Sequence, residues 1–246
     1  MPLLEELEAS GNWLFRWRSY LPLGLLVLIF AGLSHFRYPF GSHFLDEAWE
    51  LVCLGVSSVG LLVRALTVGF APKGTSGRNT KRQVADELNT TGMYSIVRNP
   101  LYLGNFVIIL GVVVFPRVWW IPLVYLLVFM LYYERIIFAE EMFLRRKFGE
   151  AYVEWASRTP AFLPRFSQWK RPSISFSWKT VLRREYHGAF AVVAAVFLLE
   201  TVTELYQGHG LAVDNMWRYI LGFGAAGYVL IRFLHKQTSL LKVKGR

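Results

Sequence analysis

The chain has almost no cysteine, and this scarcity excludes two architectures. Its single cysteine, Cys53, lies inside an apolar run. One thiol cannot form an intrachain disulfide, and it cannot supply the several thiolates of a cysteine-rich metal centre. We therefore expect Cys53 to be a small, packed residue without a chemical role.

Histidine is scarce as well, and its spacing predicts no metal centre. Short helical spacing between histidines is a usual mark of a metal site. The five histidines are instead scattered along the chain, at positions 35, 43, 187, 209 and 235. The sequence therefore predicts no resident metal.

Acidic residues are too few to balance the basic ones. The 246 residues carry 17 acidic and 27 basic side chains, for a formal net charge of +10, yet 54% of them are hydrophobic and 16% aromatic. The apolar residues form long runs, which predicts an all-α, polytopic membrane protein. The basic residues flank these runs, as membrane topology and anionic lipid headgroups require, so no nucleic-acid partner is expected.

The N-terminal segment shows no cleavable signal peptide. It carries Glu5, Glu6 and Glu8, and its first apolar run is not followed by a small-residue cleavage site. Residues 3–20 mix leucine and tryptophan with charged side chains, a pattern typical of a helix that lies in the membrane interface.

About six membrane helices are predicted from the apolar runs. The runs lie at about 19–36, 48–70, 100–116, 118–138, 187–206 and 216–234. The sixth contains Gly222, Gly224 and Gly227, small residues that favour close helix packing in a bilayer. Arg64, inside the second run, is expected to extend to the cytoplasmic interface.

The third and fourth runs are joined by a very short turn, Pro116-Arg117. Two helices joined so closely must form a tight hairpin, whose open ends lie together on one side of the membrane. This hairpin is therefore expected to bring Arg98 close to Glu140 and Glu141, although some forty residues separate them.

The distribution of charge predicts the orientation. Most of the 27 lysines and arginines fall in the N-terminus, the 71–98 loop, the 139–185 region and the C-terminus, all on one side of the predicted helices. Positive loops remain in the cytoplasm, so both termini are expected there, with the plasma or inner membrane as the location if the source is bacterial.

A polar loop marked by glycine leads into a proline at the start of the third apolar run. Its pattern is Gly92-x-Tyr94-x-x-x-Arg98-Asn99-Pro100-x-Tyr102-x-Gly104. Proline is tolerated in the first helical turn and favours an extended conformation at Asn99. Arg98 and Asn99 then lie beside the unpaired N–H groups of a helix N-terminus, a place suited to an anion.

Together with three later segments, this loop resembles the isoprenylcysteine carboxyl methyltransferase and phospholipid methyltransferase superfamily of membrane enzymes. The later segments are Glu140-Glu141-x-x-Leu144, Phe148-Gly149-x-x-Tyr152 and Phe162-Leu163-Pro164. The resemblance divides the chain into an interfacial helix and first span (1–47), a methyltransferase-like core (48–165) and a C-terminal two-span extension (166–246). The family usually has histidine where this chain has Asn99, which cannot titrate near neutral pH.

The resemblance implies S-adenosylmethionine as the cofactor, in a pocket at the cytoplasmic face. Arg98 and Asn99 are the implied catalytic residues, and Arg98 suits the cofactor carboxylate. Glu140 or Glu141 suits the ribose diol or the ammonium of the cofactor. Adjacent helical residues point about 100° apart, so the two carboxylates should differ in role. Glu141 is favoured as the one that contacts the cofactor. The implied cofactor-binding set is Tyr94, Arg98, Asn99, Pro100, Tyr102, Gly104, Glu140 and Glu141.

Simpler roles remain open for several of these residues. Arg98 can be only a positive-inside anchor, and Glu141 can pair with Arg145 on its own helix. Glu134, among apolar residues, can line the pocket or pair with a neighbour. The closing segment that carries Tyr152, Trp155, Arg158 and Pro164 can cover the cofactor or be an amphipathic interfacial helix.

The sequence thus predicts S-adenosylmethionine-dependent methyl transfer to the headgroup of a lipid or lipid-modified substrate at the cytoplasmic face. An oxygen acceptor, carboxylate or phosphate, is preferred over an amine because it needs no general base. One alternative is a membrane sterol-type reductase that uses a nicotinamide cofactor. Another is a non-enzymatic transporter or scaffold, disfavoured because no discontinuous span or paired midplane charges are evident.

Overall fold

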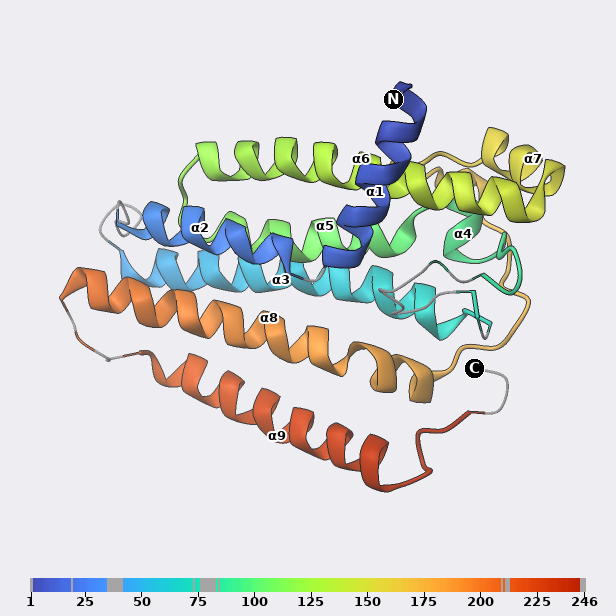
Figure 1. The fold of residues 1–246 in the computed structure, drawn as a ribbon. Helices are drawn as coiled ribbons and strands as arrows, with labels where there is room; N and C mark the ends of the chain where they lie inside the picture. Colours follow the sequence, from blue (N-terminus) through green and yellow to red (C-terminus); the bar gives the residue numbers. More distant parts are fainter. Residues whose placement is uncertain are drawn as a thin grey trace.

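The computed structural model of the chain is a bundle of helices (Figure 1). It describes residues 2–18, 20–34, 42–72, 74–75, 83, 85–208, 210 and 213–243. No strand occurs in these ranges, which confirms the all-α class. The elements are α1 (Leu3–Trp17), η1 (Leu21–Gly24), α2 (Leu25–Leu33), α3 (His43–Gly69), α4 (Met93–Ile96), α5 (Pro100–Val113), α6 (Trp120–Phe148), α7 (Glu150–Arg158), η3 (Phe166–Gln168), α8 (Trp178–Gln207) and α9 (Asn215–Gln237).

The long helices lie roughly side by side, with α6 at one edge of the bundle, α9 at the other and α3, α5 and α8 between them (Figure 1). Helix α1 crosses α6 at a steep angle and packs against it. The short helices α4 and α7 lie at the same end of the bundle. Both halves of the sequence motif are therefore gathered at that end.

Three helices of the described chain, α3, α6 and α8, are long and apolar enough to cross a membrane. This confirms a membrane protein, but the predicted count of six is not confirmed. Helix α2 has only nine residues, and α5 has 14. At about 1.5 Å per residue, neither spans a hydrocarbon core about 30 Å thick. Residues 19, 35 and 36 of the first predicted span lie outside the described ranges.

Glycine allows α3 and α5 to approach closely. A Cβ on Gly60 would lie 2.6 Å from the carbonyl oxygen of Gly104, closer than real Cβ atoms come. In α9, by contrast, a Cβ would meet a neighbour only at Gly224, and would face open space at Gly222 and Gly227. The prediction of close packing by all three α9 glycines is therefore wrong for two of them.

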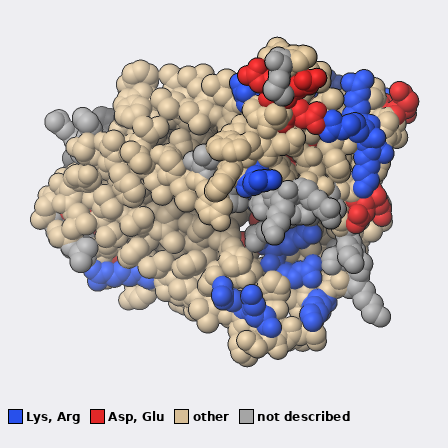
Figure 2. Space-filling view, viewed as in Figure 1, with Lys and Arg blue, Asp and Glu red and all other residues tan. Residues whose placement is uncertain are grey.

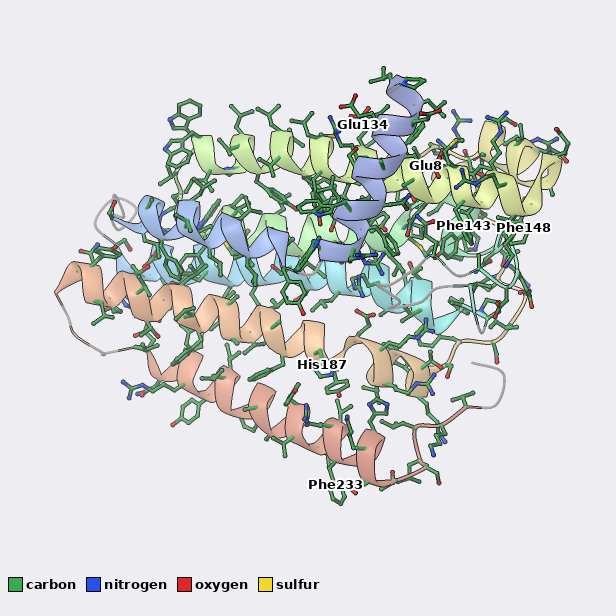
Figure 3. The ribbon with its side chains drawn as sticks, in the orientation of Figure 1. Glu8, Glu134, Phe143, Phe148, His187 and Phe233 are labelled. Atoms are coloured by element: carbon green, nitrogen blue, oxygen red, sulfur yellow. The ribbon has the colours of Figure 1, made fainter. Side chains whose placement is uncertain are left out.

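The surface divides into a charged end and a mostly uncharged middle. Charged side chains gather at the end that carries α7, with a smaller basic group near the start of α9 (Figure 2). Large apolar side chains such as Leu62 of α3 and Leu131 of α6 are exposed. Phe233 of α9 points away from the bundle (Figure 3). Such an apolar belt beside a charged end suits a bilayer.

Candidate active site

A cavity of about 740 Å³ opens at the motif end of the bundle. Its size falls in the range of small-molecule sites, about 300–1,000 Å³. Its walls come from α1, α3, α5, α6, α8 and the loop between α3 and α5. Six of the eight predicted site residues line it: Tyr94, Arg98, Asn99, Pro100, Tyr102 and Glu140.

The two halves of the motif meet through an ion pair. Arg98 Nε lies 3.3 Å from Glu141 Oε1, and both side chains are largely buried. The pair joins the loop before α5 to the last turns of α6, as the predicted hairpin requires. Glu141 does not line the cavity. Its carboxylate instead holds the Arg98 side chain at the cavity wall.

Glu140 is the carboxylate that lines the cavity. Its Oε1 lies 3.6 Å from Nη1 of Arg18, which arrives from the end of α1. The same Arg18 nitrogen donates a hydrogen bond of 3.4 Å to the hydroxyl of Tyr102. The adjacent carboxylates therefore differ in direction: Glu140 faces the cavity and Glu141 faces Arg98, and which of them contacts a cofactor stays a prediction.

Two tyrosines of the motif loop and the closing segment remain neutral. Burial raises the pKa of Tyr94 well above its ordinary value. Burial and then the negative charge of Glu141 raise the pKa of Tyr152. Near neutral pH both phenols therefore remain protonated and do not act as bases.

The segment after α6 braces the motif loop from outside. Trp155 Nε1 donates to the carbonyl of Tyr94 at 3.2 Å. The backbone N–H of Arg98 donates to the carbonyl of Pro160 at 2.9 Å. None of residues 148–164, all of which the structure describes, lines the cavity. The expected lid is therefore a support for the loop that carries Arg98.

Asn99 belongs to the same brace. Its backbone φ of −120° lies in the range that the following proline favours, but its ψ of 58° is outside the extended region that was predicted. Its Nδ2 donates a hydrogen bond of 3.0 Å to the carbonyl of Ala161, and the side chain makes no capping bond to α5. The amide thus fixes the loop to the segment after α7, at the edge of the cavity.

Arg64 lies inside the bundle rather than at the interface. Its guanidinium donates to both carboxylate oxygens of Glu185 on α8, at 2.7 and 2.9 Å, and to Asn105 Oδ1 on α5 at 2.6 Å. All three residues line the cavity. The expectation that Arg64 extends to the interface is wrong, because its guanidinium is held between α5 and α8.

Two predicted positions lie elsewhere. A Cβ on Gly104 would lie 2.5 Å from Cγ of Arg64, so this glycine makes room for the arginine and does not line the cavity. Glu134 lies beside α1 (Figure 3), is exposed and is absent from the cavity wall.

Sequence reasoning missed several polar residues of the cavity wall. They come from segments outside the motif, and the one available signal was a charged side chain within or beside an apolar run. These residues are Arg18, Arg64, Asn105, Arg184, Glu185 and His187.

Comparison with known proteins gives the family. The phospholipid methyltransferase family matches residues 49–151. The nickel-cobalt-cadmium resistance protein NccN of Alcaligenes xylosoxydans xylosoxydans is 34% identical over 160 residues, which are 64% of this chain and 67% of the relative. The cobalt-zinc-cadmium resistance protein CzcN of Cupriavidus metallidurans is 35% identical over 179 residues, 68% of this chain and 72% of the relative.

A third relative is an enzyme by name. The protein-S-isoprenylcysteine O-methyltransferase of Schizosaccharomyces pombe is 27% identical over 157 residues, 60% of this chain and 66% of the relative. No solved structure matches the chain. The chain belongs to the isoprenylcysteine carboxyl methyltransferase and phospholipid methyltransferase superfamily of membrane methyltransferases.

Proposed function

We propose that the chain transfers a methyl group from S-adenosylmethionine to the headgroup of a lipid or lipid-modified substrate at the cytoplasmic face of the membrane. The observation that carries this proposal is the cavity in which Arg98 and Glu140, from the two halves of the motif, meet. A bilayer-embedded protein can fix the depth of a lipid substrate while the cofactor enters from the cytosol.

The residues of the cavity suit the cofactor's functional groups. Glu140 offers a carboxylate to the ribose diol or the ammonium, and Arg98, held by Glu141, offers a guanidinium to the carboxylate. Tyr94 and Tyr102 offer ring faces to the adenine. S-adenosylmethionine supplies the methyl group, and the protein's contribution is alignment of the reactants and exclusion of water.

The acceptor proposed here is an oxygen of an anionic headgroup. The cavity wall carries four arginines against two glutamates and so favours negative charge; the arginines are Arg18, Arg64, Arg98 and Arg184. Asn99 cannot titrate, and a carboxylate or phosphate oxygen needs no base. His187 also lines the cavity and can serve as a base, so methylation of an amine is the competing outcome.

The proposed active site includes residues outside the range 49–151 that matches the family. Arg18 of α1 and Glu185 of α8 both line the cavity, although they lie outside residues 49–151. We therefore assign the first helix and the C-terminal extension to the site, not to anchoring alone.

The decisive experiment is calorimetric titration of S-adenosylmethionine into the detergent-purified protein, with Glu140→Gln beside Glu134→Gln. Both changes remove one carboxylate from α6, but only Glu140 lines the cavity. We expect Glu140→Gln to lower the affinity about tenfold or more, since a hydrogen bond to a charged group contributes about 1.5–3 kcal/mol. Glu134→Gln should bind as the wild type does.

Transfer of a radiolabelled methyl group then identifies the acceptor. Label in acidic lipids supports the oxygen acceptor, whereas label only in ethanolamine lipids contradicts it. Binding of a reduced nicotinamide dinucleotide, with no affinity for S-adenosylmethionine, would replace the methyltransferase proposal with the reductase.

A second candidate function is a contribution of this methyl transfer to metal resistance. It is favoured by the names of two relatives that are 34% and 35% identical. Deletion of the gene should then lower growth in nickel, cobalt or cadmium salts, and the Glu140→Gln gene should fail to restore it. Growth unchanged by the deletion would remove this candidate.

A further inference from the structure

The end of the bundle opposite α4 and α7 gathers acidic side chains from three helices. Helices α3 and α9 begin there, and α8 ends there (Figure 1). On α3, His43, Glu47 and Glu50 follow one another at i, i+4 and i+7, so they lie on one face of the helix. Glu200 of α8 and Asp214, just before α9, lie at the same end.

Three of these residues converge at the surface. His43 Nε2 lies 3.4 Å from Asp214 Oδ2, and His43 Nδ1 lies 3.9 Å from Glu47 Oε1. One potential ligand atom from each residue falls within 4.8 Å of the others. Asp214 occupies the N-cap position of α9, yet its side chain accepts no capping bond. Its carboxylate is turned towards His43 instead.

A pair of buried carboxyl groups adjoins this triad. Glu50 and Glu200 are each only 2% exposed, and their carboxyl groups contact each other. Trp217 Nε1 donates to Glu50 Oε2 at 2.6 Å, but Glu50 Oε1 and Glu200 Oε2 have no hydrogen-bond partner. Ionised carboxylates only accept hydrogen bonds, so two that face each other in a buried place require a proton or a cation.

The buried pair and the surface triad form one electrostatic unit. The charge of Asp214 acts on Glu200, and the charge of Asp46, which is itself paired with Arg117, acts on both Glu50 and Glu200. A cation held at the surface would therefore be stabilised by the triad and by the carboxyl groups behind it. The half-exposed side chains of His43 and Glu47 give such a cation access from solvent.

We propose that His43, Glu47 and Asp214 bind a divalent transition-metal cation at this end of the bundle, with Glu50 and Glu200 as a buried layer of acidic groups behind it. One imidazole nitrogen with two carboxylate oxygens suits Zn²⁺, Co²⁺ or Ni²⁺, whereas Ca²⁺ and Mg²⁺ prefer oxygen ligands alone. Metal–ligand bonds of about 2.0–2.2 Å require ligand atoms roughly 3.4 Å apart, the separation already present between His43 and Asp214. The site lies at the opposite end from the cavity and does not depend on methyl transfer.

The test is titration of Zn²⁺ alone into full-length protein purified without a polyhistidine tag, with Co²⁺ absorption as a second readout. We expect one equivalent to bind, and we expect His43→Ala and Asp214→Asn each to weaken binding at least tenfold. His235→Ala, which removes a histidine from the other end of α9, and Glu154→Gln, which removes an exposed carboxylate of α7, are matched controls that should bind as the wild type does.

The buried pair gives a further check. Glu50→Gln should weaken Zn²⁺ binding, because it removes a source of negative charge behind the ligands. If this variant does not fold, Glu47→Gln at the surface replaces it. Absence of stoichiometric binding by the wild type, or wild-type affinity in the double variant His43→Ala with Asp214→Asn, would overturn the proposal.

Discussion

Arg64 joins three helices of the bundle, α3, α5 and α8. It pairs bidentately with Glu185 on α8 and donates to Asn105 on α5, and its side chain is 16% exposed. Removing one partner of a buried ion pair leaves the other charge uncompensated, which costs more than the pair itself contributes. The arginine is therefore a structural requirement as well as part of the cavity wall.

We predict that Arg64→Gln lowers the free energy of unfolding by about 3 kcal/mol, because Glu185 would remain buried without a cation. Chemical unfolding in detergent micelles measures this change. Arg158→Gln is the control, since Arg158 pairs with Glu154 on the surface of α7, where both side chains are about two-thirds exposed. That pair should contribute less than about 1 kcal/mol. Equal effects of the two substitutions would contradict a buried role for Arg64.

At the scale of elements, the contact between α3 and α5 depends on missing side chains. A Cβ on Gly60 would lie 2.5 Å from the backbone nitrogen of Ile108 and 2.6 Å from the carbonyl oxygen of Gly104. These are backbone atoms of α5, which cannot rotate away. Since α5 begins at Pro100 beside Arg98, displacement of this helix moves the wall of the cavity.

We predict that Gly60→Ala destabilises the protein by about 1–3 kcal/mol, as overpacking typically does, and weakens S-adenosylmethionine binding through displacement of α5. Gly222→Ala on α9 is the matched control. A Cβ there meets nothing within 4 Å, and alanine is the better helix former by about 1 kcal/mol, so stability should rise or stay unchanged. Thermal unfolding and calorimetry distinguish the two variants. A harmless Gly60→Ala would show that α3 and α5 are not closely packed.

The sequence alone was enough to predict the features that depend on a local pattern or on one short connection between helices. The helical class follows from the apolar runs, and proximity of Arg98 to Glu141 follows from the turn at residues 116 and 117. The Arg64–Glu185 pair joins residues 121 positions apart, and no periodicity announces such a contact. The cluster of His43 with Asp214 was hidden in the same way, because its ligands come from two helices that meet only in the fold.

For the whole molecule, the opposite ends of the bundle carry different chemistry. The cavity and α7 lie at one end, and the acidic cluster of His43, Glu47 and Asp214 lies at the other (Figure 1). Basic loops remain on the cytoplasmic side of bacterial and other membranes, and a cytosolic cofactor requires its cavity there. These two arguments agree, so we predict that the α7 end faces the cytoplasm and that the acidic cluster lies at the opposite face.

Cysteine labelling tests this orientation, and the wild-type protein is the control. Cys53 is fully buried, so the wild type should not react with a membrane-impermeant maleimide. We predict that Asn215→Cys, exposed at the start of α9, is labelled in intact cells of a bacterial host. Arg158→Cys, exposed on α7, should be labelled only after the membrane is permeabilised. The reverse pattern would place the cavity outside the cytoplasm, where S-adenosylmethionine is not made, and the proposed chemistry would then fail together with the orientation.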